Sequence, residues 1–260
     1  MQISKTIYKA LWLLLSAPTL GLLSTASHFA IANEEAPAWS YGGTENSTHW
    51  GDIDQAYKTC KLGRDQSPIN LENAVEAAPA NITFNYQPAP LEVFNNGHTV
   101  QVNYAPGSTV SINGETYDLL QFHFHTPSEH LFEGEAAPME VHLVHRNAAK
   151  ELAVVGIAMV AGEADPIVEQ IWANIPEASE TKQAAGVMIN AADLLPSSLT
   201  YQSYIGSLTT PPCSEAVKWN VMVEPIEVSE EQIETFSTLY QVNARPVQPT
   251  NGRQIERHGG

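Results

Sequence analysis

Alternating apolar and polar positions dominate the middle of the chain and predict a series of β-strands between residues 81 and 160. Residues 98–104, His-Thr-Val-Gln-Val-Asn-Tyr, repeat with a period of two, as a strand with one buried face requires. The alternating run Thr109–Ile112 is followed by Asn113-Gly114, the dipeptide most typical of a two-residue hairpin turn. Glu115 begins the return strand, so we expect a hairpin here.

The continuous apolar run Leu152–Val160 is rich in β-branched residues and predicts a central strand covered on both faces, and Val217–Val223 resembles it. Helical signals are short: Asp165-Pro166 opens a stretch to Asn174, and Ser229-Glu230-Glu231-Gln232 is a capping box before a helix to about Tyr240. We therefore expect a mainly β (α+β) fold. It is a single domain with a large, mostly antiparallel, twisted central sheet and short peripheral helices.

The first 32 residues have the three parts of a secretory signal peptide. Lys5 and Lys9 form a basic start, Ala10–Leu23 is apolar, and Ala30-Ile31-Ala32 fits the small-residue cleavage rule. A membrane anchor is the alternative, but the apolar stretch is interrupted and too short for a hydrocarbon core of about 30 Å. We expect cleavage of residues 1–32, a mature domain at 33–260, and no membrane insertion afterwards.

Charge and cysteine content narrow the class further. The chain has a formal charge of −17, and Lys5 and Lys9 are the only Lys, Arg, Asp or Glu before residue 33, so removing two positive charges leaves −19. Such a surface repels nucleic acid and anionic membranes. In an exported protein, Cys60 and Cys213 are candidates for one disulfide, the alternative being two buried thiols. We expect a periplasmic or secreted protein.

Three histidines predict the chemistry. Gln121, His123 and His125 alternate along one run, so a strand turns all three side chains to the same face. The same alternation places Glu140 beside His142 on a second apolar run. If the two runs pair in one sheet, three neutral imidazoles converge with a carboxamide and a carboxylate behind them. This arrangement predicts a zinc site with its fourth position open and one ion per chain.

An H-x-H pair alone is more often structural than a pair of metal ligands. The remaining histidines have a sequence context that is less typical of metal ligands. His145 has the opposite alternation to His142, which predicts a core histidine. His130 is predicted to have a structural hydrogen-bonding role. His28, His49 and His258 have no metal-like spacing.

Six motifs follow one another between about Trp39 and Arg253, essentially the whole mature chain. They are Gln66-Ser67-Pro68-Ile69-Asn70, Asn96-Gly97-His98, Gln121-Phe122-His123-Phe124-His125, Ser128-Glu129-His130, Glu140-Val141-His142-Leu143-Val144-His145 and Gly206-Ser207-Leu208-Thr209-Thr210-Pro211-Pro212. In this order they resemble the motifs of the α-class carbonic anhydrases, most closely the exported bacterial branch. The resemblance implies a zinc enzyme, with 33–260 as its catalytic domain, that reversibly hydrates carbon dioxide to bicarbonate and a proton.

By this resemblance, His123, His125 and His142 are the zinc ligands, and Gln121 and Glu140 are hydrogen-bonding partners of His123 and His142. Zinc bound by three neutral imidazoles keeps its full charge and lowers the pKa of bound water from about 16 to about 7. The implied nucleophile is therefore zinc-bound hydroxide.

The resemblance also assigns the substrate site. Glu129 and Thr209 correspond to the pair that orients the hydroxide, and Thr210 corresponds to a residue that positions bicarbonate. An apolar wall would hold carbon dioxide beside the metal; its members are Val144, Val154, Leu208, Val217 and Trp219. Each of these alone is typical of an ordinary core. Val144 is the most informative, because its alternation matches His142 and places it on the metal face.

His98 corresponds to the proton shuttle, since an imidazole that titrates near pH 6.5 passes protons in both directions. Tyr41, Asn96 and Gln101 match residues that line the water network. Cys60 and Cys213 match the disulfide of exported members. Those members often dimerise, so a homodimer is an expectation from the resemblance alone.

Two other classes of function compete. His123-x-His125 followed by Glu129 and Gly134 resembles the first cupin motif, which binds iron or manganese, but Tyr117 stands where that motif needs glycine. A zinc-storing or ligand-binding module related to carbonic anhydrases would need only the metal ligands. Hydration of carbon dioxide by the purified, zinc-loaded protein separates an enzyme from both alternatives.

Overall fold

A computed structural model describes residues 38–78 and 81–259. The chain divides into two units, and the described residues all belong to the second, Pro37–Gly260. The predicted signal peptide, residues 1–32, lies outside the described residues. Within the described ranges, no helix combines the length and apolar character that crossing a membrane requires.

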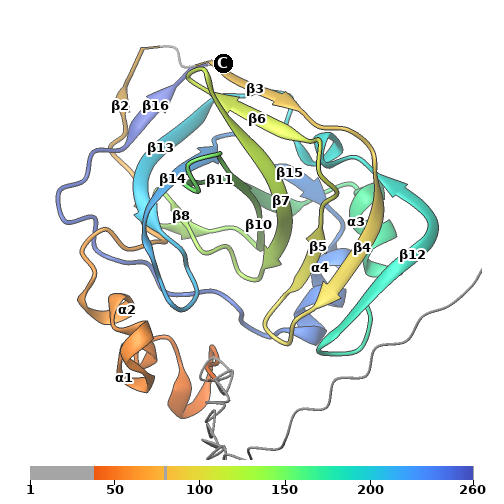
Figure 1. The fold of residues 1–260 in the computed structure, drawn as a ribbon, viewed down its shortest axis with the longest axis horizontal. Helices are drawn as coiled ribbons and strands as arrows, with labels where there is room; N and C mark the ends of the chain where they lie inside the picture. Colours follow the sequence, from red (N-terminus) through yellow and green to blue (C-terminus); the bar gives the residue numbers. More distant parts are fainter. Residues whose placement is uncertain (1–37, 79–80, 260) are drawn as a thin grey trace, which may run out of the picture. The chain divides into compact units, whose positions relative to one another are not determined.

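Most of the regular structure is strand, and thirteen of the strands in the described ranges join in one large sheet. Its main path is β12-β4-β5-β7-β10-β11-β14-β13-β16-β2, while β3, β6 and β15 pair at its sides (Figure 1). The bounds are β2 Val75–Glu76, β3 Ile82–Asn85, β4 Ala89–Asn95, β5 Val100–Asn103, β6 Thr109–Ile112, β7 Glu115–His125, β10 Met139–Arg146, β11 Leu152–Ala161, β12 Glu180–Ile189, β13 Tyr201–Ser207, β14 Glu215–Met222, β15 Ile226–Val228 and β16 Glu256–His258. A second sheet consists of β1 Asn70–Leu71, β8 Leu131–Phe132 and β9 Glu135–Ala136.

The helices are short, and the two that the sequence predicts, after Asp165 and after Ser229, begin where expected. They are α1 Trp50–Ile53, α2 Thr59–Leu62, α3 Pro166–Trp172 and α4 Glu230–Leu239, with 3-10 turns η1 Gly43–Glu45, η2 Gln55–Tyr57 and η3 Ala191–Leu194. The Asp165 side chain accepts from two backbone N–H groups at the start of α3. Ser229 and Gln232 form the predicted capping box of α4. The prediction for α3 was two residues too long, because the helix ends at Trp172 and Ala173 is its C-cap.

Strand pairing confirms the mainly antiparallel sheet and adds one feature. The β6–β7 hairpin places Ile112 opposite Glu115, and Asn113 and Gly114 have φ angles of 52° and 83°, as its two-residue turn requires. The parallel pairs of this sheet are β16 with β2 at one edge and, in its interior, β11 with β14 and β15, although β11 pairs antiparallel with β10. Its position inside the sheet explains its continuous apolar sequence.

The sheet separates two apolar clusters. On one face, Phe122 and Phe124 of β7 pack in the larger cluster with residues of α3 and α4, and the Phe124 ring lies 4.8 Å from that of Trp172. The smaller cluster includes Val144 of β10 and Trp219 of β14. Because residues alternate along β7 and β10, the predicted ligand histidines lie on the face opposite to α3 and α4.

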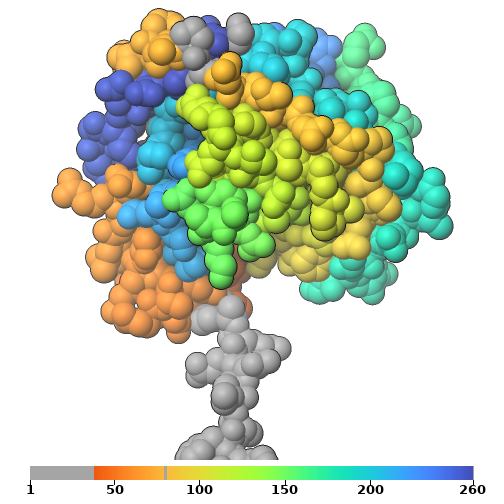
Figure 2. Space-filling model, turned by 45° about the horizontal axis from the view of Figure 1, so that its top comes forward, coloured from red at the N-terminus to blue at the C-terminus, as the bar shows by residue number. Residues whose placement is uncertain are grey.

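A disulfide connects the first helices to the sheet. The α1–α2 segment and the loop between β13 and β14 lie side by side, in orange and light blue in both views (Figure 1 and Figure 2). Cys60 of α2 is bonded to Cys213 of this loop, which confirms the predicted pairing. Thr209 and Thr210 belong to the same loop, so the disulfide anchors the segment that carries them.

Candidate metal centre

The pairing of β7 with β10 brings the three predicted histidines together. The two strands are antiparallel, with His123 opposite His142 and His125 opposite Glu140. Each histidine offers one ring nitrogen, and these three nitrogens lie within 4.8 Å of one another. His125 and His142 are buried and His123 is partly buried. Strand alternation and the pairing of two runs are therefore sufficient to build this cluster.

The second nitrogen of each ring is already hydrogen-bonded, which fixes the nitrogen left for a metal. His123 Nδ1 lies 2.9 Å from its acceptor, His125 Nδ1 2.7 Å and His142 Nε2 2.9 Å. The acceptors are the side chains of Gln121 and Glu140 and the main-chain carbonyl of Asn243. The free atoms are Nε2 of His123, Nε2 of His125 and Nδ1 of His142. Among them, His125 Nε2 is buried without a hydrogen-bond partner.

Burial keeps the three imidazoles neutral, the form that binds a metal. Desolvation lowers the pKa of His123 well below 6.5, with further lowering from the other two histidines. It lowers the pKa of His125 to about 4 and also lowers the pKa of His142. Three neutral nitrogens suit zinc, whereas calcium and magnesium prefer oxygen ligands. The cluster therefore fits a zinc ion.

Glu140 connects one candidate ligand to the neighbouring loop. Its Oε1 accepts from His142 Nε2 at 2.9 Å and from His130 Nδ1 at 2.7 Å, and its Oε2 accepts from the backbone N–H groups of Glu129 and His130. Burial by itself would raise the pKa of Glu140, but His130 and His142 hold it well below its usual range. The ionised carboxylate thus fixes the tautomer of His142.

A second group of possible ligand atoms, from His130, Glu140 and His142, overlaps the first. In that group the close atoms already bond one another, since Glu140 accepts from both histidines. A metal there would have to displace these bonds. The predicted structural role of His130 agrees with this arrangement, and its Nε2 is also hydrogen-bonded to the Tyr204 hydroxyl at 2.7 Å.

Gly156 leaves room for the Glu140 carboxylate. It lies on β11 directly opposite His142. A Cβ atom at this position would be 3.0 Å from Glu140 Oε1, closer than ordinary van der Waals contact. Glycine in a strand interior costs stability, so its position here is explained by the close approach of the carboxylate.

Glu129 lies beside the three histidines. Its Oε1 accepts from the backbone N–H of Arg245 at 2.8 Å, and its Oε2 is 3.5 Å from His125 Nε2 and 3.8 Å from His142 Nδ1. Burial raises the pKa of Glu129 to about 7, while His142, the Arg245 N–H and the Thr209 hydroxyl act to lower it. A divalent cation among the histidines would favour the ionised carboxylate further.

The five predicted wall residues belong to one apolar cluster next to the histidines. Val144, Val154, Val217 and Trp219 are buried in it, and Leu208 packs against it. Val144 lies opposite Val154 in the sheet, and Val154 lies opposite Trp219. The Trp219 ring is 4.9 Å from the His142 ring. An apolar surface therefore begins directly beside the candidate metal ligand.

His98 lies in the turn before β5 and is partly exposed. Its ring stacks on Trp39 with centroids 3.8 Å apart and planes 10° apart. Its backbone N–H donates to Asn96 Oδ1 at 2.9 Å, and burial lowers its pKa below 6.5. Asn96 therefore shapes the turn that presents His98. Gln101 lies farther along, on β5 opposite His123.

Tyr41 and Thr210 occupy the margin of the site. Burial raises the pKa of Tyr41 well above 10, and the next largest cause is the charge of Glu129. The tyrosine therefore stays protonated at neutral pH. The Thr210 carbonyl accepts from the Cys213 N–H at 2.8 Å, which connects the threonine loop to the disulfide.

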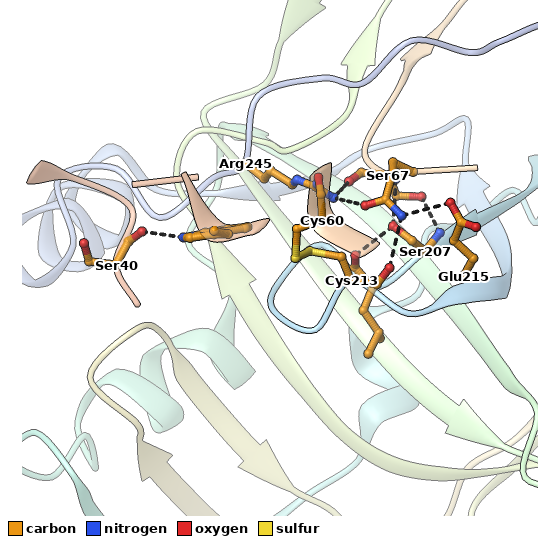
Figure 3. Close-up of a disulfide and its surroundings, with 10 residues drawn as sticks. Ser40, Cys60, Ser67, Ser207, Cys213, Glu215 and Arg245 are labelled. Carbon is orange, nitrogen blue, oxygen red and sulfur yellow. Dashed lines mark hydrogen bonds between the residues drawn. A yellow bond between two sulfur atoms is a disulfide. The ribbon is translucent and has the colours of Figure 1, made fainter. Parts of the chain in front are cut away.

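Arg245 binds the segments around the Cys60–Cys213 disulfide, as Figure 3 shows. Its guanidinium donates to the main-chain carbonyls of Cys60 and Ser67 and to the Gln66 side chain, at 2.8–2.9 Å. Sequence reasoning missed Arg245 and Asn243, which lie in a segment, 241–250, without helix or strand. They contact Glu129 and His125 through backbone atoms, for which residue type is no signal.

Comparison with known proteins agrees with this geometry. The sequence profile described as eukaryotic-type carbonic anhydrase matches residues 45–259. A carbonic anhydrase of Nostoc sp. is 42% identical over 259 residues, covering 97% of this chain and 98% of the relative. A hyperthermostable carbonic anhydrase from a hydrothermal vent chimney has a TM-score of 0.83, with 47% identity over 85% of this chain and 100% of that one.

The α-carbonic anhydrase of Thermovibrio ammonificans, solved with the inhibitor sulfanilamide, has a TM-score of 0.82 and 39% identity, over 85% of this chain and 100% of that chain. The fold and the histidine cluster define a protein of the carbonic anhydrase type. This chain belongs to the eukaryotic-type, or α-class, carbonic anhydrase family.

Proposed function

We propose that the protein catalyses the reversible hydration of carbon dioxide at one zinc ion held by His123 Nε2, His125 Nε2 and His142 Nδ1. The observation that carries this proposal is the convergence of three neutral imidazole nitrogens. In each ring the second nitrogen is hydrogen-bonded to an acceptor, which fixes the orientation of the ring. When bound, zinc lowers the pKa of a coordinated water to about 7 and so supplies a nucleophile at neutral pH.

Glu129 and Thr209 orient that nucleophile. The Arg245 N–H donates to Glu129 Oε1. In the proposed site the other oxygen, which is buried without a hydrogen-bond partner, accepts the hydroxyl proton of Thr209. The Thr209 oxygen is then an acceptor, so it favours a nucleophile that points its proton toward the threonine and its lone pair toward carbon. Thr210 holds the product bicarbonate. The influence of Thr209 on the Glu129 pKa supports their proximity.

The apolar wall holds carbon dioxide without hydrogen bonds. Carbon dioxide is uncharged and accepts hydrogen bonds weakly, so dispersion contacts with Val144, Val154 and Trp219 are its main source of binding. Val217 and Leu208 complete the same surface. The wall also excludes water from one side of the site, which strengthens electrostatic interactions among the polar groups.

His98 transfers the proton to solvent. Its ring is partly exposed and stacked on Trp39, and its lowered pKa lets the imidazolium release a proton readily. Tyr41, Asn96 and Gln101 line the water network between His98 and the histidine cluster. In His98→Ala, hydration in dilute buffer should fall and added imidazole should restore it.

Zinc analysis of single variants tests the ligand assignment. Alanine at His123, His125 or His142 should remove zinc and hydration activity together. His145→Ala is the matched control, because His145 is also a buried histidine of β10 but bonds Tyr86 on the other face. Full zinc occupancy in His142→Ala would refute the assignment. Zinc-loaded wild-type protein without hydration activity would favour a storage module.

We also propose that the protein is exported to the periplasm or secreted, with residues 1–32 as the signal peptide. The Cys60–Cys213 disulfide supports this proposal, since disulfides persist in oxidising compartments. N-terminal sequencing of the mature protein tests it, and a start near residue 33 is the expected result.

A further inference from the structure

Asn243 uses every hydrogen-bonding group it has. Its backbone N–H donates to the Thr126 carbonyl at 3.0 Å, and its side-chain Oδ1 accepts from the Thr126 N–H at 2.7 Å. Its side-chain Nδ2 donates to the carbonyls of Phe124 at 2.9 Å and His98 at 3.0 Å. Its own carbonyl accepts from His125 Nδ1. The residue is fully buried, so no water replaces these partners.

These bonds join two parts of the proposed site. Thr126 and Phe124 flank His125, so the carboxamide holds the end of β7 on both sides of a candidate zinc ligand. The bond to the His98 carbonyl fixes the turn that carries the proposed shuttle. His98 thus has its N–H held by Asn96 and its carbonyl held by Asn243. The carboxamide bonds the backbone on both sides of the cluster.

We propose that the Asn243 carboxamide is a positioning group that sets the distance between the His98 turn and the metal-ligand strand. This inference rests on the proposed function, in which His98 moves a proton away from the histidine cluster. Proton transfer depends steeply on donor–acceptor geometry, and a misplacement of about 1 Å can cost up to about 100-fold in rate. Asn243 therefore affects proton transfer without contacting the metal or the substrate.

The test compares Asn243→Ala with Thr99→Val and His98→Ala. Asn243→Ala should lower hydration in dilute buffer by about 10-fold, and imidazole should restore it, while the exchange between carbon dioxide and bicarbonate stays near wild type. Zinc release to a chelator should also become about 10-fold faster, because the acceptor of His125 loses its support. His98→Ala should show the first effect without the second.

Thr99→Val is the matched control for general loosening. The Thr99 hydroxyl donates to the same Phe124 carbonyl at 2.5 Å, is buried, and does not bond the His98 carbonyl. The near-isosteric variant should lose stability yet keep proton transfer and zinc retention near wild type. Equal effects of Thr99→Val and Asn243→Ala on proton transfer would overturn the inference, because the cause would then be loss of packing.

Asn243→Asp is the second test variant, to be used if Asn243→Ala does not fold. Its carboxylate keeps the shape and the acceptor for Thr126 but lacks the NH₂ that bonds the His98 and Phe124 carbonyls. Imidazole rescue is again the expected result, and unaltered buffer dependence overturns the inference. Inactive wild-type protein would refute the proposed function together with this inference, whereas an active wild type with an unaltered Asn243→Ala refutes the inference alone.

Discussion

Replacing Gly156 by alanine should weaken zinc binding through Glu140. The new Cβ would lie 3.0 Å from Glu140 Oε1, so the carboxylate must move by about 0.4 Å to reach ordinary contact. That oxygen accepts from His142 at 2.9 Å and from His130 at 2.7 Å, and both bonds would be strained. Disturbing a group behind a metal ligand costs about 10- to 100-fold in affinity. We expect about 10-fold, because Gly156→Ala shifts the acceptor without removing it.

Stability should fall in the same variant. Overpacking costs about 1–3 kcal/mol, and the reduced entropy of the unfolded chain offsets about 0.4–1 kcal/mol of that loss. A net loss of about 1–2 kcal/mol corresponds to a melting temperature lower by about 3–6 °C in a domain of this size. Calorimetry on the zinc-free protein measures the stability, and chelator competition measures zinc affinity.

Gly42→Ala is the control for the substitution itself. Apart from its two chain neighbours, no atom of the described residues lies within 4 Å of a Cβ built at Gly42, and its φ of −122° suits alanine. This variant should keep the wild-type zinc affinity, and its melting temperature should equal or slightly exceed that of the wild type, because alanine reduces the entropy of the unfolded chain. If Gly156→Ala behaves in the same way, the close fit between β11 and the Glu140 carboxylate has no bearing on metal binding, and the reasoning fails.

Three further predictions concern the wall, the disulfide and acid stability. Val144→Tyr should fill the space beside the apolar wall and severely reduce the rate of carbon dioxide hydration at unchanged zinc content. Near-normal turnover would show that carbon dioxide does not bind beside Val144. Reduction of Cys60–Cys213, which closes a separation of 153 residues, should cost about 5 kcal/mol in the chain-entropy model and lower the melting temperature. Burial lowers the pKa of His145 to about 4. Between pH 6.5 and 4 this imidazole is therefore protonated in the unfolded chain but neutral in the folded protein. Stability should therefore fall over that range by about 3 kcal/mol, and His145→Gln should flatten the denaturation profile.

Turns and helix starts that depend on a few neighbouring residues were predicted correctly from the sequence. The Asn113-Gly114 turn and the Ser229 capping box depend on neighbouring residues, and both are present. The edge strand β12, Glu180–Ile189, was not predicted, because it pairs only with β4 and most of its residues are exposed. Without one buried face, such a strand has no clear period of two.

The parallel or antiparallel pairing of the buried strands could not be predicted from the sequence pattern either. The apolar run of β11 indicates burial on both faces, but it is equally compatible with parallel and antiparallel neighbours. Its parallel partner β14 follows only after α3, β12 and β13 along the chain. Gly156 within that run has no explanation until the sheet places it against the strand that carries Glu140.

The hydrogen-bond acceptors of the three candidate zinc ligands show how much of the metal centre strand alternation can predict. Gln121 and Glu140 each lie two residues before their histidine, so alternation along one strand places both acceptors on the metal face. For His125 the residue two positions earlier is His123, itself a candidate ligand, so the strand offers no acceptor. The sequence therefore requires a partner from elsewhere without identifying it. The structure supplies the carbonyl of Asn243, 118 residues away, and the same residue also holds the His98 turn. A distant segment thus completes the part of the site that local alternation cannot build.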